Sequence, residues 1–107
     1  MNFPSISTIV PVYNGAAFIE AALDSVLTQR VESSEVIVIN DGSTDNTREI
    51  LQALSKHIIV IEQENLGPAA ARNRGLERAN GELLAFLDAD DLWSNDALTQ
   101  LLSLIHI

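Results

Sequence analysis

The sequence of 107 residues contains no cysteine, so disulfide bonds and thiolate metal sites are both excluded. Basic residues are also few: 6 Lys and Arg stand against 15 Asp and Glu, which gives a formal net charge of −9. Surfaces that bind nucleic acids or anionic membranes need clustered positive charge, so this balance argues against a nucleic-acid partner. A nucleotide ligand stays open, because a bridging cation reverses the local sign of the charge.

Long apolar segments are missing as well. The apolar runs have the length of β-strands, and none is long enough to span a bilayer. Residues 1–4 are not a basic segment that leads into a long apolar one, so we see no signal peptide. We therefore expect a cytoplasmic protein, and attachment to the cytoplasmic face of the membrane stays open.

Two glycine motifs that bind phosphate are absent. No G-x-G-x-x-G follows the first expected strand, and no G-x-x-x-x-G-K-[ST] occurs anywhere. The dinucleotide-binding and P-loop modes therefore lack their phosphate cradles. No Ser-His-acid or Cys-His set is visible either, which argues against the usual nucleophilic hydrolases.

Patterns typical of strands and helices alternate along the chain. Strands are expected at residues 7–12, 35–40, 58–61 and 83–87, and helices at about 16–29, from 46, at 69–79 and from 94. This alternation indicates βαβ units around a mainly parallel sheet, in a single α/β domain. We expect the strand at 7–12 to lie between those at 35–40 and 83–87. Asn46 and Glu49 could form a capping box at the start of the second helix.

Polar residues directly follow three of these strands. Tyr13 follows the first and Asp41 the second, while Asp88-Ala89-Asp90-Asp91 follows the strand at 83–87. Carboxyl ends of parallel strands share one edge of a sheet, where ligands bind. Several carboxylates this close together repel one another and need a cation between them, and Mg²⁺ and Mn²⁺ prefer such oxygen ligands. The sequence therefore predicts a metal site and an anionic ligand at this edge.

Each feature also has a plainer explanation. The acidic residues at 88–91 could form a turn that caps the next helix, and 40–45 could be an ordinary strand-to-helix turn. Tyr13 could sit at the rim of the core. Arg72, in the helix at 69–79, could reach a base edge or a phosphate, whereas Arg74 and Arg78 are better explained as solvated surface charges.

Four stretches together resemble the family 2 glycosyltransferases, the large group with the GT-A nucleotide-sugar fold. They are 9–14 (IVPVYN), 38–45 (VINDGSTD), 65–73 (NLGPAAARN) and 86–91 (FLDADD). The stretches occur in the order found in the family, and the resemblance covers the chain up to about Leu98. It implies a Rossmann-like GT-A fold, here partial and three-layered, with a mainly parallel sheet.

The resemblance also implies roles for individual residues. Tyr13 would stack near the base, Pro11 would contribute backbone contacts, and Asp41 would hydrogen-bond the base, usually uracil. Arg72 would lie near the base or the diphosphate.

The D-x-D motif of the family corresponds to Asp88 and Asp90. Asp88 would lean toward the ribose and Asp90 toward a Mn²⁺ or Mg²⁺ ion on the diphosphate. Asp88 and Asp91 are further candidates for the metal.

The implied reaction is metal-dependent transfer of a sugar, with inversion, from a nucleotide-diphosphate donor to an acceptor hydroxyl. A UDP-sugar is the expected donor, and a saccharide or lipid-linked molecule in polysaccharide biosynthesis is the expected acceptor. Family members are longer, and their base and acceptor site come from the second half. We therefore expect residues 1–107 to form a truncated, N-terminal, donor-binding part that has no catalytic base, is inactive alone and self-associates through an exposed edge.

Rival interpretations remain. A non-catalytic module that binds nucleotide sugars, or a folded remnant without a ligand, fits the same residues. A related nucleotidyltransferase would need a glycine-rich basic loop after the first strand, which 14–17 (NGAA) does not supply. A response-regulator receiver would need paired acids at that same place.

Overall fold

The computed structural model describes residues 5–28 and 34–87 of the chain. In chain order its elements are β1 (Ile6–Val12), α1 (Ile19–Leu27), β2 (Glu35–Asp41), α2 (Thr47–Ala53), β3 (Ile59–Gln63), α3 (Pro68–Arg78) and β4 (Leu83–Phe86). Every strand and helix expected within these residues is present. The expected helix from residue 94 lies outside the described residues.

The four strands form one parallel sheet in the order β3-β2-β1-β4. The prediction that β1 lies between β2 and β4 is therefore confirmed. Ile9 in β1 is paired with Ile37 in β2 on one side and with Phe86 in β4 on the other. The carboxyl ends of β1, β2 and β4 consequently face the same edge of the sheet.

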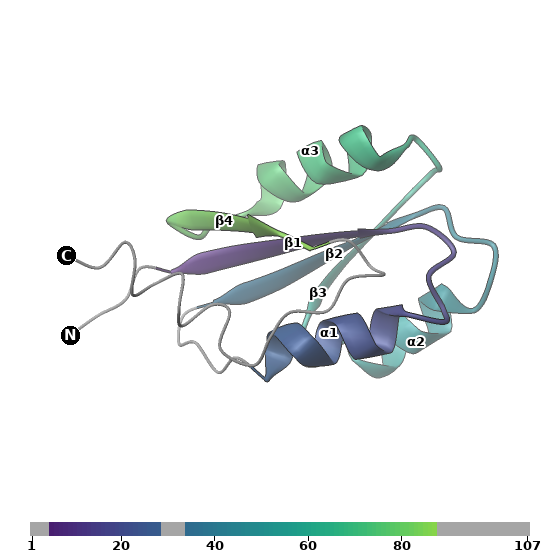
Figure 1. Ribbon diagram of the computed structural model, residues 1–107. Coiled ribbons are helices and arrows are strands. Elements are labelled where there is room, and N and C mark those ends of the chain that lie inside the picture. Colours follow the sequence, from purple (N-terminus) through teal and green to yellow (C-terminus); the bar gives the residue numbers. More distant parts are fainter. Residues whose placement is uncertain (1–4, 29–33, 88–107) are drawn as a thin grey trace.

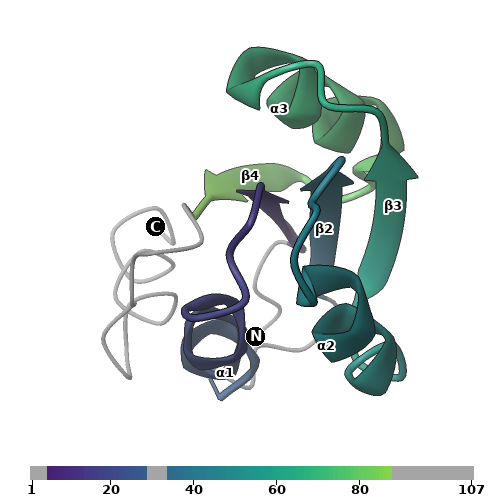
Figure 2. The same ribbon diagram turned by 90° about the vertical axis from the view of Figure 1, so that its right-hand side faces the viewer.

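Helices cover both faces of this sheet. Helix α3 lies on one face, and α1 and α2 lie on the other (Figures 1 and 2). Successive strand residues point to opposite faces, so Val10 packs in the cluster beneath α1 and α2, whereas Ile9 packs against α3. Because both faces are covered, β1 and β2 each carry a continuous apolar run, at residues 9–12 in β1 and 36–39 in β2.

Helix α3 approaches the sheet closely because its inner face is made of small residues. Ala71 and Gly75 are buried in that face. A Cβ atom added to Gly75 would lie 2.5 Å from Cγ2 of Ile9 and 2.9 Å from Cδ1 of Ile39. The small residues thus set the height of α3 above β1 and β2, and with it the position of Arg72.

Two local predictions were wrong. The first helix begins at Ile19 rather than near residue 16, because the amides of Phe18 and Ile19 both donate to the carbonyl of Gly15, at 2.9 and 2.8 Å, in a preceding turn. Asn46 does occupy the N-cap position of α2, but its side chain makes no capping hydrogen bond, so the capping box does not form. The side chain of Asp45 instead satisfies the first amide of the helix, since it accepts from the amide of Thr47 at 3.0 Å.

Strand β4 has one free edge within the described sheet. Leu84 and Phe86 on this strand are exposed, and self-association through this edge stays a prediction. Within residues 5–28 and 34–87, no helix has the length and apolar character needed to cross a membrane.

Candidate functional site

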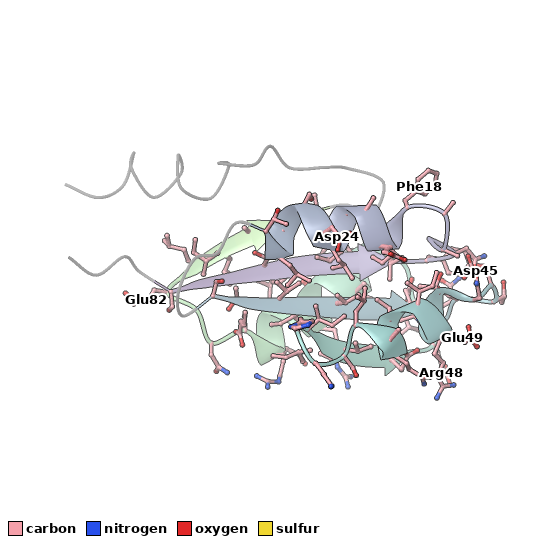
Figure 3. The ribbon with its side chains drawn as sticks, turned by 90° about the horizontal axis from the view of Figure 1, so that it is seen from below. Phe18, Asp24, Asp45, Arg48, Glu49 and Glu82 are labelled. Carbon is pink, nitrogen blue, oxygen red and sulfur yellow. The ribbon has the colours of Figure 1, made fainter. Side chains whose placement is uncertain are left out.

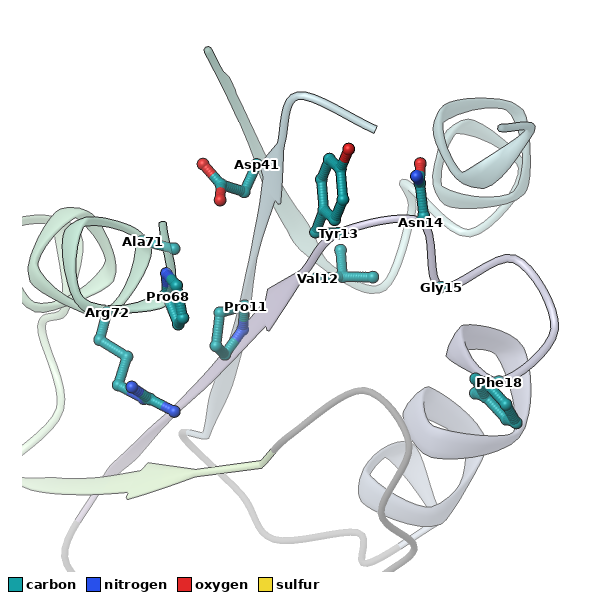
Figure 4. Close-up of a pocket in the computed structure, with 10 residues that line it drawn as sticks. All are labelled: Pro11, Val12, Tyr13, Asn14, Gly15, Phe18, Asp41, Pro68, Ala71 and Arg72. Carbon is teal, nitrogen blue, oxygen red and sulfur yellow. The ribbon is translucent and has the colours of Figure 1, made fainter. Parts of the chain in front are cut away.

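A pocket of about 280 Å³ opens at the carboxyl edge of the sheet (Figure 4). Its walls come from the end of β1 and the following loop, from the end of β2, and from the start of α3. The residues that line it are Pro11, Val12, Tyr13, Asn14, Gly15, Phe18, Asp41, Pro68, Ala71 and Arg72. Its volume is near the lower end of the ~300–1,000 Å³ typical of small-molecule sites.

The structure brings four of the predicted site residues into this pocket: Pro11, Tyr13, Asp41 and Arg72. They come from three separate stretches of sequence. The remaining predicted residues, Asp88, Asp90 and Asp91, lie outside the described residues. Among the residues that the structure does describe, no group of three or more His, Asp or Glu side chains could hold a metal ion.

Asp41 is the most constrained side chain of the pocket. It is only 4% exposed, and its carboxylate accepts three hydrogen bonds. Oδ1 accepts from Nε2 of Gln63 at 2.8 Å and from the amide of Leu66 at 2.8 Å, and Oδ2 accepts from the amide of Gly67 at 3.0 Å. Burial raises the pKa of Asp41, but these three donors outweigh burial and lower the pKa below its ordinary value.

The bonds to Asp41 also hold the loop between β3 and α3 against the end of β2. Gly42 lets that loop come close, because a Cβ at this position would lie 2.6 Å from the backbone nitrogen of Asn65. Its φ of 70° is also in the region that favours glycine. The loop leads into Pro68 at the first turn of α3, so Asp41 helps to position the wall that carries Arg72.

Tyr13 and Arg72 add an aromatic ring and a positive charge to the lining of the pocket. The ring of Tyr13 is 50% exposed, although Val12 just before it is buried in the core. The side chain of Arg72 extends from α3 to the side of the pocket where Pro11 and Pro68 lie (Figure 4). The pocket therefore combines a half-exposed aromatic ring, a buried carboxylate and a guanidinium group.

Asn14 joins the two loops that follow β1 and β2. Its φ is 51°, a left-handed conformation that asparagine tolerates better than most residues. Its Oδ1 accepts from the amide of Thr44 at 2.7 Å and more weakly from the amide of Asp45 at 3.3 Å. The backbone amide of Asn14 donates to Oγ of Ser43 at 2.9 Å.

Asp45 completes this connection from the other loop, at the carboxyl end of the sheet (Figure 3). Its Oδ2 accepts from the amide of Ala16 at 3.2 Å, and its Oδ1 accepts from the hydroxyl of Thr47. The Thr47 hydroxyl in turn accepts from the amide of Gly15 at 3.1 Å. The hydrogen bond from the Thr47 side chain is the main reason why the pKa of Asp45 is lowered.

A second set of hydrogen bonds, made by Asn40 at the end of β2, supports the connection between the two loops. Asn40 is 1% exposed, and its Nδ2 donates to Oε1 of Glu62 at 2.9 Å. Its Oδ1 accepts from the hydroxyl of Ser43 at 2.5 Å. Residues 40–45 thus do more than turn the chain: they hold the loop that carries Tyr13 and Asn14.

Six of the ten lining residues were not predicted as site residues, and Phe18 and Asn14 are two of them. Phe18 was assigned to a helix that starts earlier, yet it lies in the turn before α1 with 54% of its surface exposed. Its place one residue before the buried Ile19 was the available signal that it points away from the core. The sequence places Asn14 beside Tyr13 at the end of the first strand, but it gave no reason to assign Asn14 a role in the site; the signal was that an asparagine directly after a strand is a common carrier of positive φ.

Comparison with known proteins gives a consistent result. The family model described as glycosyl transferase family 2 matches residues 7–106. TuaG of Bacillus subtilis (strain 168), which is named as a teichuronic acid biosynthesis glycosyltransferase, is 47% identical to this chain over 100 residues. The match covers 89% of this chain but 39% of TuaG, so the chain spans about two fifths of the length of that relative.

Solved structures resemble the chain over nearly its whole length. S. aureus TarS 1–349 in complex with UDP has a TM-score of 0.87 at 33% identity, over 94% of this chain and 32% of TarS 1–349. The mannosyltransferase PcManGT from Pyrobaculum calidifontis, in complex with GDP-Man and Mn²⁺, has a TM-score of 0.84 at 34% identity, over 92% of this chain and 31% of PcManGT. The predicted partial GT-A fold is thereby confirmed.

Proposed function

The chain belongs to glycosyl transferase family 2, and from that premise we propose that its pocket binds the nucleotide of a nucleotide-diphosphate sugar. The observation that carries the proposal is the convergence of Pro11, Tyr13, Asp41 and Arg72 in one pocket. The UDP bound by TarS and the GDP-Man bound by PcManGT support it from related structures. A UDP-sugar is the proposed donor.

The chemistry of the lining suits the parts of such a ligand. The half-exposed ring of Tyr13 can stack on a planar base. Asp41, held ionised by its donors, can only accept hydrogen bonds, so it suits an N–H group of the base. Arg72 can pair with phosphate oxygens in a bidentate manner, and Pro11 offers backbone contacts beside the base.

A divalent ion completes the proposed site. Asp90 is the proposed ligand, with Asp88 and Asp91 as further candidates, and Asp88 is also proposed to contact the ribose. Their hard carboxylate oxygens fit Mn²⁺ or Mg²⁺, and PcManGT was solved with Mn²⁺. When bound, the ion would neutralise charge on the leaving diphosphate.

The whole reaction is proposed to be an inverting transfer of the sugar to an acceptor hydroxyl. A saccharide or lipid-linked acceptor in polysaccharide biosynthesis is consistent with the name of TuaG, and would place the reaction in the cytoplasm or at the cytoplasmic face of the membrane. We assign residues 1–107 to the donor-binding part of the enzyme. No residue of this chain is proposed as the catalytic base.

Thermal unfolding with UDP, GDP and CMP, each with and without Mn²⁺, tests the proposal. A ligand at ten times its dissociation constant stabilises the folded state by about 1.4 kcal/mol, which raises the Tm of a domain this size by about 6–11 °C. We expect such a rise with UDP and Mn²⁺ and a smaller one with CMP, which has a single phosphate.

Variants locate the effect in the pocket. Tyr13→Ala and Arg72→Ala should reduce the UDP-dependent rise. Arg74→Ala is the matched control, because Arg74 is an exposed arginine of the same helix. If no nucleotide raises the Tm of the wild type, the donor-site proposal is wrong and the folded-remnant interpretation is favoured.

A further inference from the structure

The support of Asp41 comes from a residue that does not line the pocket. Gln63 is the last residue of β3, and the parallel register pairs it directly with Asp41 at the end of β2. Its carboxamide donates to Oδ1 of Asp41 at 2.8 Å. Since an ionised carboxylate only accepts hydrogen bonds, the Nε2 group is the end of this amide that must face Asp41.

The three donors to Asp41 leave room for a ligand. Within residues 5–28 and 34–87, Oδ1 receives two hydrogen bonds and Oδ2 receives one. A carboxylate oxygen accepts about two, so Oδ2 keeps one acceptor position, in a side chain that lines the pocket together with Tyr13. The carboxylate is held from two sides, by a neighbouring strand and by a loop, and so cannot turn freely about its Cβ–Cγ bond.

We propose that Gln63 is a positioning residue that fixes the carboxylate of Asp41 so that the pocket prefers a base with a ring N–H donor, uracil over cytosine. The inference rests on the proposed nucleotide site. It adds a residue behind that site, which holds the carboxylate that is proposed to meet the base.

The two pyrimidines differ at the atoms that such a carboxylate would meet. Uracil presents a ring N–H between two carbonyl groups, whereas cytosine presents a bare ring nitrogen there and carries its donor on the adjacent amino group. A carboxylate that can turn is able to accept from either donor, the ring N–H of uracil or the amino group of cytosine. A carboxylate that is held in place can accept only from the ring N–H of uracil. Against cytosine it would face the bare ring nitrogen, and two hydrogen-bond acceptors repel each other.

Removing the Gln63 donor should therefore change selectivity more than folding. Gln63→Met keeps the length of the side chain without the donor, and Gln63→Asn keeps the carboxamide but shortens its reach by one carbon. Gln52→Met is the matched control, because Gln52 is an exposed glutamine of α2.

The experiment is calorimetric titration of the 107-residue chain with UDP and with CDP, both in Mn²⁺ buffer. A hydrogen bond to a charged group is strong enough for a preference of about tenfold or more for UDP in the wild type. In both Gln63 variants we expect the preference to fall to about threefold or less, mainly through weaker UDP binding. The control should keep the wild-type ratio.

The outcomes separate the two proposals. If the wild type binds neither nucleotide, the nucleotide site itself is wrong. If the wild type binds both equally, or if the Gln63 variants lose affinity for both by the same factor or keep the full preference, the nucleotide site stands and the role of Gln63 is refuted.

A measurement on the wild type covers the case in which neither variant folds. The side-chain amide resonance of Gln63 should shift in NMR spectra on addition of UDP and much less on addition of CDP, because only uracil would share the carboxylate. Equal shifts, or none at saturating UDP, would overturn the inference.

Discussion

Replacing Asn14 tests whether the connection between the loops after β1 and β2 holds the pocket together. The residue contributes in two separable ways. Its backbone adopts a φ of 51°, and its side-chain oxygen accepts from the loop after β2. Three substitutions divide these contributions: Asn14→Ala loses both, Asn14→Gly keeps the conformation, and Asn14→Asp keeps the acceptor.

The size of the effect follows from the geometry. The bond from the amide of Thr44 is short, at 2.7 Å, and a bond of this kind contributes about 0.5–1.5 kcal/mol net. The contacts from the Thr44 hydroxyl and the Asp45 amide are longer, both at 3.3 Å, so we count them as minor. An alanine held at positive φ costs about a further 1–2 kcal/mol.

We therefore expect Asn14→Ala to lower the free energy of unfolding by about 1.5–3.5 kcal/mol, as the sum of the conformational cost and the lost bond. Asn14→Gly should lose about 1–2.5 kcal/mol, as the sum of the lost bond and the greater freedom of glycine in the unfolded chain. Asn14→Asp should stay closer to the wild type than alanine does, although its charge lies near Asp45.

Urea unfolding followed by circular dichroism gives these values, and an unchanged m-value would show that the same surface is exposed in each variant. The order of the variants is the critical result. If glycine is as destabilising as alanine, the conformational part of the reasoning is refuted. If alanine costs less than about 0.5 kcal/mol, the size of an ordinary surface change, Asn14 does not hold the loops together.

Two further predictions concern packing and pH. Gly75→Ala should lower the free energy of unfolding, because the new methyl group would lie 2.5 Å from Cγ2 of Ile9. Overpacking costs about 1–3 kcal/mol, which exceeds the gain of about 1 kcal/mol in helix propensity. A higher urea midpoint for the variant would contradict this. Acid should destabilise the chain, because Glu35, Asp41 and Asp45 all have lowered pKa values. Their contribution is complete above the unfolded pKa near 4 and is lost as the pH falls through the folded pKa values. Urea midpoints between about pH 5 and pH 2 check this, and a slope that Asp41→Asn leaves unchanged would exclude Asp41 as a contributor.

The architecture could be predicted because its signals are periodic. Four apolar strands separated by helices allow few strand orders in a parallel sheet. Right-handed crossovers favour the order in which β1 lies between β2 and β4. Convergence of Tyr13 and Asp41 then follows from the parallel sheet, which places its carboxyl ends at one edge. Local spacing carries that information, so no knowledge of side-chain contacts is needed. Arg72 lies in α3, and its place in the site was implied by the resemblance to the family.

The hydrogen bonds of the site could not be predicted in the same way. Asp41 bonds to residues 22, 25 and 26 positions later in the chain, and Asn14 bonds to residues about 30 positions later. Such bonds depend on the paths of two loops at once. The wrong capping box shows the same limit: Asn46 and Glu49 have the right spacing, but the Asn46 side chain makes no capping hydrogen bond.

These long-range bonds bear on how the chain would work. The loop after β3 is tied to Asp41, and the loop after β1 is tied to Asp45. Both walls of the pocket are thus held by the chain itself, and no ligand is needed to order them. Binding to a site ordered in advance avoids the entropic cost of arranging it. Nucleotide binding should therefore be separable from sugar transfer, and a chain that covers about two fifths of TuaG should still discriminate between bases even where it transfers no sugar.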